Sequence, residues 1–201
     1  MNFGIVILAA GASSRLGKPK QLLDYQGRKL IQHIVSVAEN SNAGSIVIVL
    51  GANHELISEV ISTSDKINMV INHHWQRGIA SSIVKGVQFL QHSNPSCDGV
   101  IITVCDQPYI SSSLINDLYT LHQQTRKHII ASSYENIVGT PVFFYKSLFP
   151  ELLTLTGDSG AKKIMIKYKE NVATVDFPFG NFDIDTFTDY ELLIKKVTND
   201  H

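Results

Sequence analysis

Cysteine is scarce in this sequence, with two residues among 201, Cys97 and Cys105. Two cysteines cannot form the disulfide framework that holds small secreted domains together, and their spacing does not match a zinc-binding motif. Cys105 also belongs to a hydrophobic run that we expect to be a buried strand. We therefore expect both cysteines to be reduced thiols in the protein core.

The sequence also lacks an excess of charge of either sign and any long hydrophobic run. Its formal net charge is −1, whereas a general nucleic-acid-binding protein is typically strongly basic, so we expect no nucleic-acid partner. The longest apolar stretches, such as Ser45 to Leu50 and Gly99 to Val104, are far shorter than the roughly 18 residues of a membrane-spanning helix. The first residues contain no basic leader of a signal peptide. We therefore expect a cytoplasmic protein without a membrane partner.

The composition is that of a folded domain, with 44% hydrophobic and 17% charged residues. A chain of this length can bury a sizeable core, so we expect a single domain over residues 1–201. Strand-like and helix-like segments alternate without long linkers or repeats, which is typical of an α/β fold.

Hydrophobic periodicity locates the main elements. A buried strand should end at Gly11, and Gly139 and Pro141 should break the chain before a later apolar strand. Ile83, Val87 and Leu90 should form the inner face of a helix that follows Gly78. The other expected elements are helices at 29–40, 55–61 and 114–125, strands at 45–51, 67–72 and 129–133, a strand within the segment 98–108 that ends at Asp106, and a final helix opened by Thr186.

A glycine-containing loop with three cations follows the first strand. Gly11 allows a ligand to approach the backbone closely, and Arg15, Lys18 and Lys20 follow it within a short distance. Cations at the carboxyl end of a central strand indicate an anionic ligand such as a nucleoside triphosphate, although a solvated basic loop would look the same. The loop is neither a Walker loop nor the GxGxxG dinucleotide fingerprint.

Two acidic residues occupy positions that suit a metal ion. Asp106 ends a hydrophobic run, where open parallel sheets bind their ligands, and could hold Mg2+ against a triphosphate. The alternative for Asp106 is the cap of a turn completed by Pro108. Asp185 precedes the last helix in the sequence DIDT, where the alternative is capping by Asp185 or Thr186. Metal binding and capping therefore both stay open for Asp106 and for Asp185.

Small residues mark the start of the helix that follows His73, His74 and Trp75. Ser81 or Ser82 could cap this helix, and its amides could also bind a phosphate or a base. Adjacent histidines point in different directions on most backbones, so we do not expect a metal site there.

Several of these segments together match a known pattern. The sequence LAAGxSxRxGxxKxLL at residues 8–23, with DQP, GxP, GDxGA and DIDT in that order, resembles the MocA-like branch of the nucleotidyltransferases, which includes molybdenum cofactor cytidylyltransferases and MobA-like proteins. The resemblance implies a Rossmann-like three-layer α/β/α sandwich, with a mostly parallel sheet and one reversed strand. It implies that Arg15, Lys20 and Asp106 are catalytic and that Asp106 and Asp185 bind Mg2+. It also implies nucleotide binding by Leu8, Ala9, Ala10, Gly11, Arg15, Lys20, Gly78, Ser81 and Ser82.

The resemblance further implies the reaction. A nucleoside monophosphate, expected to be CMP from CTP, would be transferred to a phosphorylated acceptor such as molybdopterin, a pterin, with release of pyrophosphate. Ala10 favours CTP, because the guanylyltransferase branch typically has glycine there. The loop Val138–Pro141 lacks the basic and histidine residues usual in pterin enzymes, so a sugar-phosphate or polyol-phosphate acceptor is an alternative. An inactive nucleotide-binding regulator is another, although the presence of both carboxylates argues against it.

Overall fold

The computed structural model describes residues 2–199, in which strands and helices alternate as expected. The strands are β1 (Phe3–Ala9), β2 (Asp24–Tyr25), β3 (Arg28–Lys29), β4 (Ser45–Leu50), β5 (Ile67–Ile71), β6 (Gly99–Val104), β7 (Ile129–Tyr134), β8 (Ile137–Tyr145) and β9 (Val172–Asp176). The α-helices are α1 (Leu30–Glu39), α2 (His54–Glu59), α3 (Ile79–Ser93), α4 (Ser112–Thr125), α5 (Phe149–Leu153), α6 (Lys162–Lys167) and α7 (Phe187–Asn199). Short 3-10 helices are η1 (Lys20–Leu22), η2 (Trp75–Arg77), η3 (Lys146–Leu148) and η4 (Lys169–Asn171).

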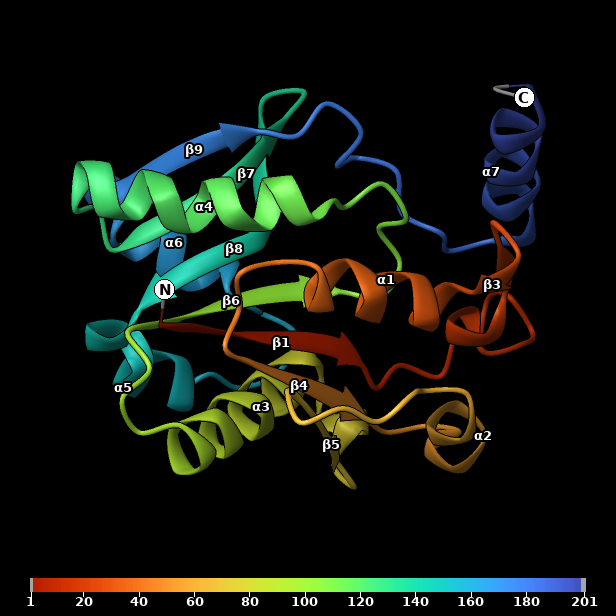
Figure 1. Ribbon diagram of the computed structural model, residues 1–201, viewed down its shortest axis with the longest axis horizontal. Helices are drawn as coiled ribbons and strands as arrows, with labels where there is room; N and C mark the ends of the chain where they lie inside the picture. The colour runs from red at the N-terminus through yellow and green to blue at the C-terminus, as the bar shows by residue number, and fades with distance from the viewer. Residues whose placement is uncertain (1, 200–201) are drawn as a thin grey trace.

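Seven strands form one sheet in the order β5–β4–β1–β6–β8–β7–β9, and β2 and β3 form a separate small hairpin. β8 is antiparallel to both of its neighbours, whereas the other pairs in the large sheet are parallel. Helices cover both faces of this sheet (Figure 1). These features confirm the expected three-layer α/β/α sandwich with one reversed strand.

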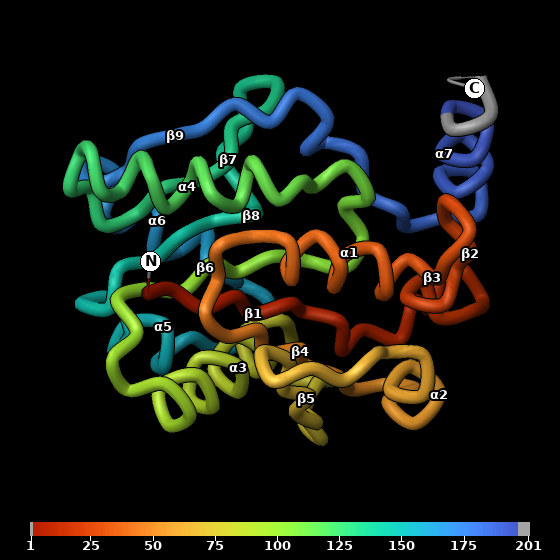
Figure 2. The backbone as a smooth tube through the Cα atoms, viewed as in Figure 1, coloured from red at the N-terminus to blue at the C-terminus, as the bar shows by residue number. Residues whose placement is uncertain are grey.

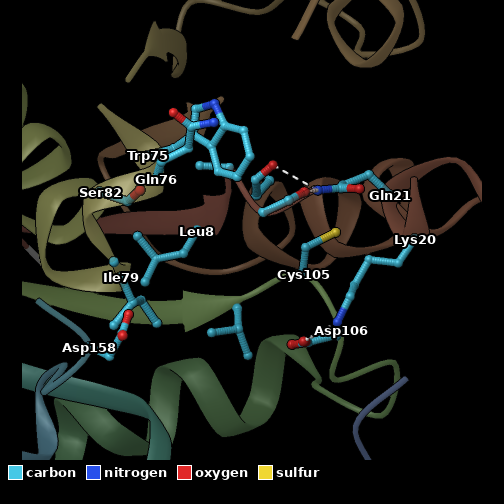
Figure 3. A pocket seen from close by; sticks show the side chains of 15 residues that line it. Leu8, Lys20, Gln21, Trp75, Gln76, Ile79, Ser82, Cys105, Asp106 and Asp158 are labelled. Carbon is cyan, nitrogen blue, oxygen red and sulfur yellow. Dashed lines mark hydrogen bonds and ion pairs between the residues drawn. The ribbon is translucent and has the colours of Figure 1, made fainter. Parts of the chain in front are cut away.

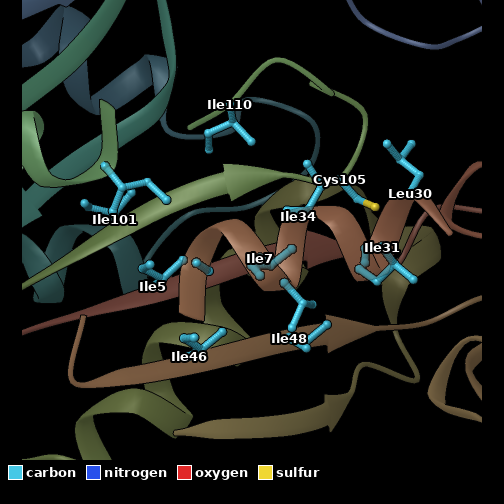
Figure 4. Packing of buried hydrophobic residues seen from close by; sticks show 14 of the residues in the cluster. Ile5, Ile7, Leu30, Ile31, Ile34, Ile46, Ile48, Ile101, Cys105 and Ile110 are labelled. Atoms are coloured by element: carbon cyan, nitrogen blue, oxygen red, sulfur yellow. The ribbon is translucent and has the colours of Figure 1, made fainter. Parts of the chain in front are cut away.

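β1 is buried along its whole length because its two faces pack against different helices. Ile5 and Ile7 belong to a hydrophobic cluster with α1 and α4, and this cluster is drawn in part in Figure 4. Val6 and Leu8 belong to a second cluster with α3, α5 and α6. The backbone trace accordingly shows α1 and α4 on one side of the sheet and α3 and α5 on the other (Figure 2).

α3 packs directly on β1, as its inner face of Ile83, Val87 and Leu90 predicts, since all three are buried. Two glycines allow this close approach. A Cβ at Gly86 would lie 2.4 Å from Cγ1 of Val6, and a Cβ at Gly4 would lie 2.5 Å from Cδ1 of Leu90. The beginning of α3 is therefore held close to the carboxyl end of β1.

The expected break at Gly139 and Pro141 is wrong, because β8 runs through both residues. The register between β7 and β8 shifts, so that Ala131 pairs with Val142 while Ser132 pairs with Gly139. Pro141 lies within this irregularity, where a residue without an N–H removes no regular ladder hydrogen bond. The hydroxyl of Ser132 donates to the Pro141 carbonyl at 2.8 Å.

α7 lies beside the hairpin of β2 and β3, at one end of the molecule (Figure 1). The Tyr190 hydroxyl donates to the Asp24 carbonyl at 2.9 Å, and Leu193 is buried in the α1 and α4 cluster. This docking brings the segment before α7 close to the loop that follows β1. No helix within residues 2–199 is both long and apolar enough to cross a membrane. Both cysteines are buried and free, as expected.

Candidate active site

The main site lies at the carboxyl ends of β1 and β6. The chain places β4 on one side of β1 and β6 on the other, so the connections leave these strand ends in opposite directions and open a crevice between them. A cavity of about 380 Å³ occupies this position, and we call it the nucleotide cavity (Figure 3). Its lining residues are Leu8, Ala9, Ala10, Gly11, Lys20, Gln21, Trp75, Gln76, Gly78, Ile79, Ser82, Val104, Cys105, Asp106 and Asp158.

The loop after β1 is fixed by its own side chains. The buried amide of Gln21 donates to the carbonyls of Ala9 at 2.8 Å and Gly11 at 3.1 Å. The Lys20 amide donates to the Ser13 hydroxyl at 3.0 Å, and Ser13 has a left-handed backbone with a φ of 54°. A Cβ at Gly11 would meet no atom within 4 Å, so open space lies in front of this backbone. The loop therefore presents a rigid, open cradle of the kind that phosphate groups occupy.

Four charged side chains from distant parts of the chain meet at the edge of the nucleotide cavity, and we call them the charge cluster. Lys20 Nζ contacts Asp106 Oδ2 at 2.8 Å and Asp185 Oδ1 at 2.9 Å. Arg15 Nη2 contacts Asp185 Oδ2 at 2.8 Å. Lys20 and Asp185 are 165 positions apart in sequence, so only the folded chain can bring them together.

Asp185 does not cap α7, although the sequence allowed that reading. The carboxylate of Asp189 accepts hydrogen bonds from the amides of Asp185 and Thr186, at 3.1 and 2.7 Å. The Asp189 amide in turn donates to the Thr186 hydroxyl at 3.2 Å, which completes a reciprocal cap. The Asp185 carboxylate is thus left to contact Lys20 and Arg15.

The electrostatics of the charge cluster favour its ionised form. Hydrogen bonding from Lys20, followed by the charges of Lys20 and Arg15, lowers the pKa of Asp185. Burial alone would lower the pKa of Lys20, but the attraction of Asp106 and Asp185 outweighs it and raises that pKa. Asp183 differs, because burial and then the charges of Asp106 and Asp185 raise its pKa to about 6. Because Asp183 as a whole residue is exposed, solvent weakens both this effect of burial and the repulsion by the other two carboxylates.

The carboxylates suit a metal ion that is shared with a nucleotide. Among residues 2–199, no group of three or more His, Cys, Asp or Glu side chains is arranged to hold a metal by itself. Mg2+, however, is usually bound by one or two carboxylates together with substrate phosphates and water. Oxygens of Asp106 and Asp185 already converge on one positive charge, the Lys20 ammonium. This donor set therefore fits a divalent cation accompanied by a triphosphate.

The structure separates the predicted nucleotide-binding residues into two groups. Leu8, Ala9, Ala10, Gly11, Lys20, Gly78 and Ser82 line the nucleotide cavity. Arg15 lies beside it in the charge cluster, and Ser81 lines a different cavity. Lys18, the third cation of the loop, is directed towards α7, with Nζ 5.3 Å from the centre of the Tyr190 ring.

The expected capping of α3 by Ser81 or Ser82 is wrong. α3 begins at Ile79 after Gly78, which has a φ of 96°, and no side chain caps it. The Ala80 amide donates to the Gly157 carbonyl at 3.1 Å, so a distant loop supplies the acceptor that a capping serine would have provided. The Ser81 hydroxyl donates to the Gly78 carbonyl at 2.8 Å instead.

Sequence reasoning missed several residues that line the nucleotide cavity. Trp75 and Gln76 reach it from η2, which the pattern of the sequence did not predict (Figure 3). Asp158 reaches the same cavity from the loop before α6, a helix that follows Ala161 without a side-chain cap. A Cβ at Gly78 would lie 2.5 Å from Asp158 Oδ1, which shows how closely the two segments pack.

Comparisons with known proteins find a matching family model and similar proteins. Residues 5–172 match the family model described as the MobA-like NTP transferase domain. The chain is 31% identical over 166 residues to nicotine blue oxidoreductase of Paenarthrobacter nicotinovorans, a match that covers 78% of each chain. It is 30% identical over 115 residues to a probable molybdenum cofactor guanylyltransferase of Bacillus mycoides, covering 56% of this chain and 53% of that protein.

A solved structure extends the similarity to nearly the whole chain. The crystal structure of Rv0371c from Mycobacterium tuberculosis has a TM-score of 0.83 and 26% identity, and the match covers 97% of this chain and 98% of that one. Another structure of Rv0371c, in complex with manganese, has a TM-score of 0.75, 24% identity and coverage of 97% and 99%.

Proposed function

Because the chain belongs to the MobA-like NTP transferase family, we propose that this nucleotidyltransferase uses Mg2+ to transfer a nucleoside monophosphate from its triphosphate to a phosphorylated acceptor, with release of pyrophosphate. The charge cluster is the observation that carries the proposal. It places two cations and two carboxylates beside an open glycine cradle, at the strand ends where α/β sheets bind ligands. The manganese complex of Rv0371c supports a divalent metal for this fold.

Asp106 and Asp185 would hold Mg2+, which would screen the negative charge of the triphosphate as the acceptor approaches. An oxygen of the acceptor attacks the α-phosphorus in line, a new P–O bond forms, and the bond to pyrophosphate breaks. Lys20 and Arg15 then donate hydrogen bonds to the pyrophosphate oxygens, on which negative charge accumulates. Catalysis on this account rests on positioning and charge, without a covalent intermediate on the enzyme.

The remaining side chains of the nucleotide cavity would position the substrate. Gln21 holds the carbonyls of Ala9 and Gly11, so the cradle keeps its shape before a phosphate binds. Ser82, Gln76 and the Trp75 ring line the part of the cavity formed by η2 and α3, where polar groups and an aromatic face suit a base. The buried methyl group of Ala10 supports CTP rather than the larger GTP.

The acceptor is proposed from similarity to a relative, whereas the reaction is proposed from the charge cluster. The similarity to a molybdenum cofactor guanylyltransferase supports a pterin, and a sugar or polyol phosphate remains the alternative. The three ion pairs of Lys20 and Arg15 with both carboxylates argue against an inactive regulator. A cytoplasmic location stays a prediction from the sequence.

Pyrophosphate release tests the proposal directly. The protein would be incubated with Mg2+ and each of the four NTPs, with molybdopterin, sugar phosphates or polyol phosphates as acceptors. We expect pyrophosphate with CTP and one acceptor class, and none from the Asp106→Asn variant. Thermal shift with NTPs alone separates binding from turnover. Stabilisation by an NTP without pyrophosphate from any acceptor would favour the regulator, and no stabilisation by any NTP would contradict the nucleotide site.

A further inference from the structure

A second cavity also lies at the start of α3, next to the nucleotide cavity. Its volume is about 430 Å³, and we call it the basic cavity. Arg77, Lys85 and His74 contribute its charged or basic groups, and no carboxylate side chain is among its lining residues. Leu153 and Leu155 contribute an apolar wall. The cavity therefore combines donors for an anion with a surface for a hydrocarbon or aromatic group.

The cations of the basic cavity form no ion pair with any residue that the structure describes. Within residues 2–199, neither the Arg77 guanidinium nor the Lys85 ammonium makes an ion pair, and both residues are exposed. Asp158, which follows the lining residue Gly157 in sequence, lines the nucleotide cavity instead. Unpaired arginine and lysine side chains around one concavity create a positive potential that attracts an anion. A guanidinium also matches the geometry of a phosphate through two parallel hydrogen bonds.

A polar wall keeps the two cavities separate. Buried Asn72 donates to the Ser81 hydroxyl at 2.8 Å and to the Ser82 hydroxyl at 3.0 Å. Asn72 and Ser81 line the basic cavity, whereas Ser82 lines the nucleotide cavity. Likewise, Gly157 lines the basic cavity and Asp158 lines the nucleotide cavity. Both cavities can therefore be occupied at the same time.

We propose that the basic cavity binds a small organic phosphate, a phosphate monoester with an apolar or aromatic group, alongside the nucleotide. The phosphate would contact Arg77 and Lys85, and the organic group would lie on Leu153 and Leu155. This site requires no metal, because its positive charge is not neutralised by carboxylates. It is independent of the reaction proposed above, since no residue of the charge cluster lines it.

Phenyl phosphate is a suitable probe, with inorganic phosphate and phenol as its two halves. Each would be titrated into the full-length, ¹⁵N-labelled protein in EDTA, and amide shifts would be followed by NMR. We expect saturable shifts at Lys85, Gln88, Thr156 and Gly157 with phenyl phosphate, and binding about tenfold or more weaker for either half. Shifts confined to the loop around Gly11, or equal binding of phenol, would overturn the proposal.

Variants test which side chains hold the phosphate. Arg77→Ala and Lys85→Ala should each weaken phenyl phosphate binding by about tenfold, the loss expected for one charge-assisted hydrogen bond. Arg77→Lys keeps the charge and should recover part of the affinity. Lys66→Ala removes an exposed lysine that does not line the basic cavity, and should change nothing. Unchanged affinity in both Arg77→Ala and Lys85→Ala, with native amide spectra, would rule out the site.

Discussion

The nucleotide cavity and the basic cavity share a wall at Asn72, Ser81 and Ser82. They differ in whether their positive charges are paired with carboxylates. In the charge cluster, both Lys20 and Arg15 contact carboxylates at 2.8 to 2.9 Å. In the basic cavity, Arg77 and Lys85 face no carboxylate among the lining residues. Carboxylates among cations suit a site that must hold a metal ion and a polyphosphate together. Cations without carboxylates suit an anion that binds without a metal.

The largest expected effect is a loss of turnover, which variants of the charge cluster should show and a variant of the basic cavity should not. Lys20→Ala and Asp106→Asn should each lower kcat by a factor of about 10² to 10³, or about 2.7 to 4 kcal/mol, as for the loss of one preorganised electrostatic group. Lys85→Ala should keep wild-type turnover, because Lys85 lines the basic cavity and not the nucleotide cavity. Steady-state pyrophosphate release checks this, and circular dichroism confirms that each variant is folded. A loss of turnover in Lys85→Ala equal to that in Lys20→Ala would remove the distinction between the cavities.

The second prediction distinguishes the role of Asp185 from that of Asp189, which caps α7. Asp185→Asn should lower turnover by about 10²-fold and shift its dependence on Mg2+, with little change in thermal stability. Asp189→Ala removes the acceptor of the Thr186 and Asp185 amides, and should lower the free energy of unfolding by about 1 kcal/mol with turnover retained.

Mg2+ titrations of turnover and urea unfolding measure these two effects. Wild-type turnover and Mg2+ dependence in Asp185→Asn would show that Asp106 and Asp185 do not share a metal. The Asp189→Ala variant is the matched control, because it alters the same turn without removing a carboxylate of the charge cluster.

Metal removal should affect the two cavities differently. Chelation with EDTA should weaken CTP binding by about tenfold or more, because the carboxylates of Asp106 and Asp185 then repel the phosphates without the charge of the metal ion between them. Phenyl phosphate binding in the basic cavity should change less than about twofold. Calorimetric titrations with and without Mg2+ measure both affinities. Equal metal dependence at the two sites would contradict the comparison.

The smallest effect concerns the choice of base. Ala10→Gly should move the preference from CTP towards GTP by about tenfold, the low end of the effect of one methyl-sized group in a pocket. Competition binding of CTP and GTP to the wild type and the variant checks this. Phenyl phosphate binding to the variant serves as the control for intact folding near α3. A wild-type preference for GTP would show that Ala10 does not exclude the larger base.

The sequence predicted most of the fold because the relevant signals are local. The helical spacing of Ile31, Ile34 and Val35 gives α1, and the apolar runs give β1, β4 and β6 with small errors at their ends. The glycine loop and Asp106 could be placed at strand ends for the same reason, since parallel strands bring their carboxyl ends to one edge. β8 was misplaced because the shift in register after Ala131 depends on its pairing with β7, which no local pattern encodes.

What the sequence alone determined is therefore the order of elements and the position of each chemical group along them. Only the tertiary structure decided where those groups point. Lys20 meets Asp185 because α7 docks beside the β2–β3 hairpin, and Asp189 takes over the cap. Ser81 faces the basic cavity because the Gly157 carbonyl accepts the Ala80 amide and fixes the start of α3. The direction of side chains in the first turn of a helix depends on contacts between segments far apart in the chain. Such contacts produce no periodic pattern in the sequence.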